Sequence, residues 1–169
     1  MRKHNGMRPQ DVAILLKIAA KKGESWTMKE LASELFISAS EVTESLSRNV
    51  YSGLLNSDKK QIMKTDFINF LKSGLKFVFP VKVSAIGRGM TTAYSTKPLS
   101  NMIQSSEKIV WSYATGKEKG MVIEPLIPSI PKACEIDSNF YELVALVDAL
   151  RIGKVREVNL AYEELNKRL

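Results

Sequence analysis

The sequence has little of what most catalytic and metal-binding sites need. One cysteine, Cys134, and one histidine, His4, occur among its 169 residues. A single thiol cannot form an intrachain disulfide. One cysteine and one histidine cannot complete a tetrahedral zinc site or supply a histidine-based triad with a defined pocket. A glycine-rich phosphate loop with its lysine is also missing. We therefore expect no enzyme activity, no metal and no cofactor.

Long apolar runs are missing as well. No stretch approaches the roughly 20 apolar residues of a membrane-spanning helix. The basic N-terminus lacks the apolar centre of a signal peptide. These absences lead us to expect a cytoplasmic protein with no membrane partner. With 44% apolar and 25% charged residues, the composition is typical of a globular chain that can bury a core.

Acidic residues are fewer than basic ones, and the net charge is +7. The basic excess is concentrated in two segments. Residues 1–24 carry six basic and two acidic side chains, and residues 61–100 carry six and one. A basic balance of this size favours an anionic partner such as nucleic acid, although many basic proteins bind nothing anionic.

Two short helices joined by a tight turn, over residues 27–46, are the clearest structural signal. Thr27 with Glu30 and Ser38 with Glu41 have the spacing of capping boxes. Apolar residues at helical spacing would bury one face of each helix, with a small residue where the two helices touch. This is the pattern of a helix-turn-helix, whose second helix can enter a DNA major groove. The positions expected to be buried are Leu31, Ala32, Leu35, Ile37, Val42 and Leu46.

Further elements are predicted on either side of this motif. A helix should begin at Pro9, where the missing N–H costs nothing, and end at Gly23. Trp26 should pack between that helix and the next. After the motif, a charged turn and a short strand predict a small wing, followed by a helix capped by Thr65 or Asp66.

The order of three helices, the tract SRNVYSGLL and the charged turn NSDKKQ resembles the winged helix-turn-helix domain of MarR-like bacterial transcriptional regulators, over roughly residues 9–64. With KFVFP, GRGMTTAY, EPLIPSIP and FYELVALVDALRIGKVREVNLAYEEL, most of the chain resembles a group of bacterial helix-turn-helix proteins known only as transcriptional regulators. The resemblance implies a dimeric regulator that binds double-stranded DNA. By position, it implies groove-facing residues and wing lysines near phosphates: Ser38, Ala39, Ser40, Thr43, Glu44, Ser47, Arg48, Lys59 and Lys60.

The second helix of the motif is not itself basic, because Glu41 and Glu44 oppose a single Arg48. Most of the affinity for DNA would then come from the basic flanks, since neutralising phosphates drives most DNA binding. One flank is an N-terminal arm that carries Arg2 and Lys3 and could reach phosphates or a minor groove. An untidy terminus is the alternative for that arm.

The segment after the fourth helix predicts a strand over residues 75–83, because β-branched and aromatic residues dominate it. Gly87, Arg88 and Gly89 then predict a turn, with an anion cradle of backbone amides as the alternative. Arg88 belongs to the second basic segment and would extend the DNA-facing surface.

Residues 108–124 predict a β-hairpin, since two apolar stretches flank a loop with two glycines. Trp111 is expected to face the core. Two helices should close the chain, one capped by Asp137 or Ser138 and one from residue 154 to residue 169.

Together these patterns predict an α+β protein. A winged helix-turn-helix domain over residues 1–80 would precede a small α+β region over residues 81–169. That region, with its hairpin and two C-terminal helices, would supply dimerisation, an effector pocket or a docking site for a partner, and the last two helices are the candidate dimer surface. The effector would be a small molecule or a protein. The alternative function is a protein–protein adaptor or antitoxin-like assembly subunit. RNA binding is less favoured because exposed aromatic residues are not clustered.

Overall fold

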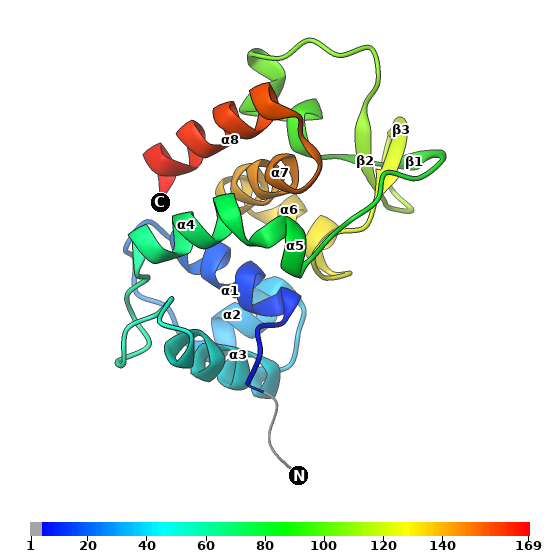
Figure 1. Ribbon diagram of the computed structural model, residues 1–169. Coiled ribbons are helices and arrows are strands. Elements are labelled where there is room, and N and C mark those ends of the chain that lie inside the picture. The colour runs from blue at the N-terminus through cyan, green and yellow to red at the C-terminus, as the bar shows by residue number, and fades with distance from the viewer. Residues whose placement is uncertain (1–4) are drawn as a thin grey trace.

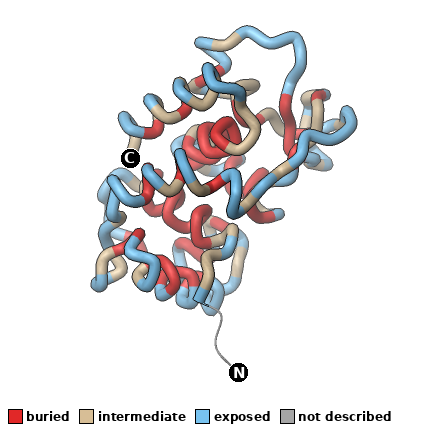
Figure 2. Tube along the Cα trace, viewed as in Figure 1, coloured by how far each residue is buried: buried red, intermediate tan, exposed pale blue. Residues whose placement is uncertain are grey.

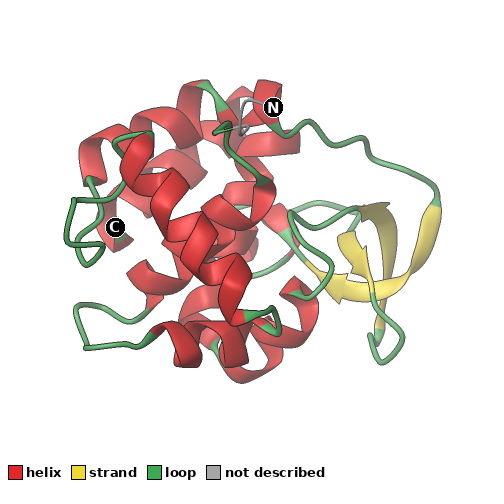
Figure 3. Cartoon of the chain, turned by 90° about the horizontal axis from the view of Figure 1, so that it is seen from below, coloured by secondary structure: helices red, strands yellow, loops and turns green. Residues whose placement is uncertain are grey.

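The computed structural model describes residues 5–169. Helices form most of the molecule, and a small sheet of three strands projects from one side, so the fold is α+β (Figures 1 and 3). The helices are α1 Pro9–Ala20, α2 Met28–Leu35, α3 Ala39–Tyr51, α4 Lys64–Ser73, α5 Leu75–Val78, α6 Ile130–Ile136, α7 Ser138–Ile152 and α8 Val155–Arg168. The strands are β1 Ile86–Thr91, β2 Ile109–Ser112 and β3 Glu118–Ile123, and η1 Ala93–Ser95 and η2 Leu99–Asn101 are short 3-10 helices.

Helices α1 and α7 form the centre of the molecule and pack against each other (Figure 2). Side chains 12–16 of α1 and 143–150 of α7 are all buried. One continuous hydrophobic cluster takes residues from both sides of position 80, so the two predicted regions share a core. The apolar residues of α7 are already covered within the monomer, so of the two helices predicted as a dimer surface, α8 is the more exposed.

A buried lysine joins α1, α2 and the start of α7. Lys17 Nζ lies 2.8 Å from Glu34 Oε2 and also contacts the carboxylate of Asp137. Asp137 in turn caps α7 by accepting from the Phe140 N–H, as one of the two predicted caps. Burial alone would raise the pKa of Glu34, but the ammonium groups of Lys17 and Lys21 outweigh it and lower that pKa. The charges therefore compensate one another at the junction of the three helices.

A second buried network attaches the sheet to α7. Asp148 is fully buried, and its Oδ2 accepts from Trp111 Nε1 at 2.7 Å and from Thr92 Oγ1 at 2.9 Å. Its Oδ1 accepts from Arg151 at 2.9 Å. Trp111 is buried as predicted, and its N–H has the partner that a buried indole requires.

The predicted hairpin over residues 108–124 is wrong, because β2 and β3 pair in parallel. Both strands pair antiparallel with β1, and two strands that run opposite to a common neighbour must run in the same direction. Strand β1 occupies the place where we predicted a turn at residues 87–89. Its glycines allow close backbone approach, since a Cβ on Gly89 would lie 1.7 Å from the Trp111 carbonyl oxygen.

The strand predicted over residues 75–83 is also wrong. The chain there forms α5, which follows α4 directly after Gly74, and then an extended connector. The three strands pair with one another in a closed set, so no strand edge is offered to this segment. Phe77 and Val78 are consequently exposed, while Leu75 alone is fully buried. The preceding helix α4 begins at Lys64, just before the predicted caps, without a side-chain cap.

Candidate nucleic-acid interface

Helices α2 and α3 are two short helices joined by a tight turn, as predicted, and both capping boxes are confirmed. The Thr27 hydroxyl accepts from the Glu30 N–H at 3.1 Å, and the Thr27 N–H donates to the Glu30 carboxylate at 2.7 Å. Ser38 and Glu41 repeat the arrangement with two bonds of 3.1 Å. Phe36, between the helices, adopts the left-handed conformation with φ of 54°. These local bonds fix where each helix starts.

The buried positions of the motif are also as predicted. Leu31, Ala32 and Leu35 of α2 and Val42 and Leu46 of α3 are buried, and Ile37 in the turn is half-buried. With these residues inside, the opposite side of α3 is left to solvent. Helix α3 lies at one end of the molecule, away from α7 and the sheet (Figures 1 and 2).

The solvent side of α3 carries the predicted polar residues. Ser38, Ser40, Thr43, Glu44 and Ser47 are all exposed. Thr43 and Ser47 donate their hydroxyl protons to carbonyl oxygens one turn earlier in α3, so their oxygen atoms remain as acceptors. The Ser47 oxygen already accepts one bond, from Lys59. Within the described chain, Ser40 has no side-chain hydrogen bond, so both its donor and its acceptor are available.

Arg48 is not exposed on this face as we predicted, and its side chain only reaches the edge of the groove described below. Its side chain is buried against α1, where Nε and Nη2 donate to the Asp11 carboxylate at 2.7 to 3.2 Å. Asp11 is fully buried, so the fork-shaped guanidinium is its counter-ion. Hydrogen bonding to Asp11 raises the pKa of Arg48 further above its usual range. The guanidinium of Arg48, which we predicted to contact bases, therefore pairs with Asp11 inside the protein.

The two acidic side chains of α3 each have a partner within the protein. Glu41 accepts from the backbone and the hydroxyl of Ser38 in the capping box. The exposed Glu44 carboxylate lies 3.6 Å from Arg48 Nη1, so it is next to the buried pair of Arg48 and Asp11. Arg48 is already the counter-ion of Asp11, and the donors to Glu41 are neutral, so the outer face of α3 keeps the two negative charges of Glu41 and Glu44.

The predicted wing is reduced to one antiparallel bridge between Leu55 and Ile62. Asn56 Oδ1 closes the turn by accepting from the backbone N–H groups of Lys60 and Gln61. The two lysines at its tip diverge. Lys59 Nζ donates to Ser47 Oγ at 3.0 Å and so lies beside α3. Lys60 Nζ instead lies 4.6 Å from the centre of the Trp26 ring.

The N-terminal segment runs beside α3. Asn5 and Arg8 line a groove of about 440 Å³ together with five residues of α3. These are the exposed Thr43, Glu44, Ser47 and Tyr51 and the mostly buried Arg48. Arg2 and Lys3, the predicted phosphate contacts of the arm, lie outside the described residues. Arg8 and the exposed Tyr51 were not among the predicted site residues. The only sequence signal for Arg8 was its place in the basic arm.

Arg88 is placed far from this surface. It lies on β1, in the projecting sheet, which is well separated from α3 in Figure 1. On the neighbouring strand, Lys119 is its direct cross-strand partner. Arg88 therefore does not extend the polar face of α3 as we predicted.

The remaining reactive group is Cys134, whose side chain is buried in α6. Burial raises the pKa of its thiol, so the sulfur stays protonated. Among residues 5–169, no group of three or more His, Cys, Asp or Glu side chains could hold a metal ion. No helix in this range is long and apolar enough to cross a membrane.

Comparison of the chain with protein families, with curated proteins and with solved structures gave no match. The resemblance to winged helix-turn-helix regulators therefore stays a prediction that rests on the sequence pattern.

Proposed function

We propose that this protein binds double-stranded DNA through α3 and regulates transcription. The observation that carries the proposal is the outer face of α3, which is polar and exposed along its length at one end of the molecule (Figure 2). A helix presented in this way fits the width of a DNA major groove.

Base contacts would come from the start and middle of α3. Recognition helices contact base edges mainly with their N-terminal residues, and Ser40 is the unpaired hydroxyl there. Thr43 and Ser47 offer acceptor oxygens, which suit the amino groups of adenine and cytosine. Glu44 could accept from a cytosine amino group in the same way.

Phosphate contacts would come from the residues flanking α3. Lys59 lies beside Ser47, and Arg8 lines the same groove as Ser47. Arg2 and Lys3 continue the same arm. Because α3 itself contributes little positive charge, the affinity should depend strongly on these flanking contacts. A dimer would place two copies of α3 on half-sites about one helical turn apart.

Binding to random-sequence duplex DNA is expected to weaken steeply as salt rises, by roughly one power of the salt concentration for each phosphate contact. The measurement is fluorescence anisotropy of a labelled duplex at several NaCl concentrations. A flat response, or no binding at low salt, would remove the DNA proposal.

Changing Lys59 to Gln is expected to reduce the salt exponent by about 1, because one phosphate contact is lost. The matched control is Lys119→Gln, which removes the same charge from an exposed site on β3, distant from α3. Equal losses in the two variants would mean that net charge, and not the surface of α3, determines binding.

A protein–protein adaptor is the second candidate. The observation in its favour is Tyr51 at the end of α3, which is 74% exposed next to the groove lined by Arg8. Exposed tyrosine and arginine are typical of protein interfaces. The adaptor role requires that Tyr51→Ala abolish partner binding while duplex DNA shows no salt-dependent binding.

A further inference from the structure

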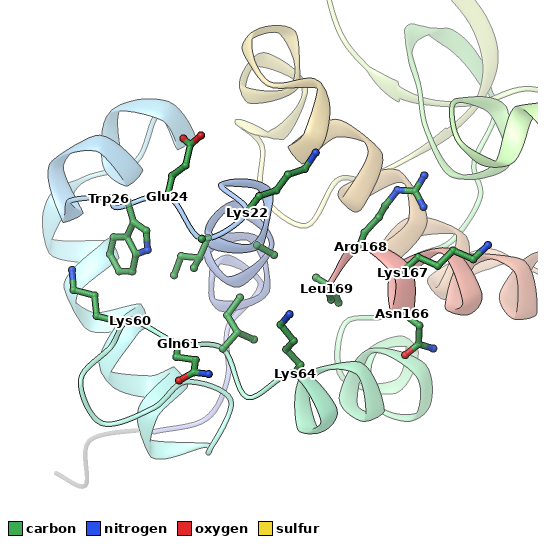
Figure 4. Close-up of a pocket in the computed structure, with 14 residues that line it drawn as sticks. Lys22, Glu24, Trp26, Lys60, Gln61, Lys64, Asn166, Lys167, Arg168 and Leu169 are labelled. Carbon is green, nitrogen blue, oxygen red and sulfur yellow. The ribbon is translucent and has the colours of Figure 1, made fainter.

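A second concave surface lies next to the turn that carries Lys59 and Lys60, on the side of Lys60 and Trp26 and not on the side of α3. It is a cleft of about 560 Å³ between the end of α1, the loop after α3 and the C-terminal end of α8 (Figure 4). This volume is in the range of small-molecule sites. Its walls come from segments far apart in the sequence, so the tertiary fold assembles it.

The cleft gathers basic side chains. Lys22, Lys60 and Lys64 line it from three different segments, and Lys167 and Arg168 line it from α8. The two α8 residues are held by Glu164, and Arg168 also by Glu142. Within residues 5–169, none of the three lysines has a carboxylate within ion-pair distance. Glu24 is the one acidic side chain in the lining.

One wall of the cleft is apolar, made by Ile18, Ala19, Trp26 and Ile62. Lys60 extends along the Trp26 ring at one end, and Arg168 stands at the other (Figure 4). The side chain of Lys64 ends between them. Lys22 and Arg168 point away from Lys64, and Lys60 lies over Trp26, so the positive charges are spread around the cleft (Figure 4). The low-dielectric wall strengthens the field of these charges in the cleft.

A small multivalent anion in the cleft would be attracted by the positive charge of these lysines. We propose that the cleft binds a small anion carrying more than one phosphate group. Lysine ammonium groups bind phosphate as point charges, and the apolar wall could cover the body of an organic phosphate. The site differs from the face of α3, because Lys59 and Lys60 point to opposite sides of the same turn.

The test is isothermal titration of the whole chain with inorganic pyrophosphate at constant ionic strength. We expect saturable binding with one site per chain, weakened at least tenfold by Lys22→Gln with Lys64→Gln. The matched control is Lys82→Gln with Lys119→Gln, two exposed lysines outside the cleft, which should leave the affinity unchanged. Absence of saturable binding, or equal weakening in both double variants, would overturn the proposal.

Tryptophan fluorescence reports whether pyrophosphate binds in this cleft. The chain has two tryptophans, and Trp111 is fully buried, whereas Trp26 lines the cleft. Pyrophosphate should change the emission of the unmodified protein and of Lys59→Gln, and the change should be lost in Lys60→Gln. A change that persists in Lys60→Gln would place the anion elsewhere and contradict the proposal.

The pyrophosphate test and the DNA-binding test can give different results, so either proposal can fail without the other. Pyrophosphate binding without salt-dependent DNA binding would support the cleft and reject the proposed function. If Lys22→Gln with Lys64→Gln weakens DNA binding while pyrophosphate does not bind, the cleft lysines serve DNA and the anion site is rejected.

Discussion

Replacing Arg48 with alanine is expected to lower the free energy of unfolding by about 3–5 kcal/mol, because the change leaves a buried carboxylate without its counter-ion. Asp11 is fully buried, and three hydrogen bonds of 2.7 to 3.2 Å join its carboxylate to the guanidinium. The measurement is equilibrium unfolding in urea, followed by circular dichroism. A loss near 0.5 kcal/mol would be typical of an exposed ion pair and would contradict this assignment.

Two further variants distinguish the effect of breaking the ion pair from the effect of changing Arg48 alone. Arg48→Lys keeps the charge but cannot reproduce the two-pronged contact, so an intermediate loss is expected. Combining Arg48→Met with Asp11→Asn removes both charges and should recover much of the stability. The matched surface control is Lys29→Ala, an exposed basic residue on α2. Its effect should stay within about 0.5 kcal/mol.

Replacing Asp148 with alanine is expected to cost a similar amount, about 3–5 kcal/mol, because three buried donors lose their acceptor. Trp111, Thr92 and Arg151 all donate to this carboxylate. Arg151 also donates to the carbonyl oxygens of Phe79 and Glu124, so the loss should loosen the connector before the sheet. Urea unfolding gives the free energy, and Trp111 emission should shift to longer wavelength as water reaches the indole.

Asp148→Asn keeps one acceptor oxygen but removes the charge, so we expect a smaller loss of unfolding free energy. Asp66→Ala, which removes an exposed carboxylate on α4, is the matched control. Equal stability of Asp148→Ala and Asp66→Ala would show that the network does not hold the sheet to α7.

The position of Arg48 shows why the site was only partly predictable. From its place on the second helix of the motif, the Arg48 side chain could face either a DNA groove or the protein core. The choice depends on Asp11, which is 37 residues earlier. Lys59 and Lys60 are adjacent in sequence, yet one contacts α3 and the other Trp26. Both outcomes depend on partners that are distant in the chain, and such partners cannot be found from spacing.

The sequence by itself determined the local features of the helix-turn-helix. Both capping boxes join residues three positions apart, and the buried face follows from a period of 3.6 residues, so short-range geometry was sufficient. Only the tertiary structure decided the direction of β2 and β3, because β1 pairs with both. The same long-range packing buried Arg48, separated Arg88 from α3, and brought three lysines, Lys22 after α1, Lys60 in the turn after α3 and Lys64 at the start of α4, to one cleft.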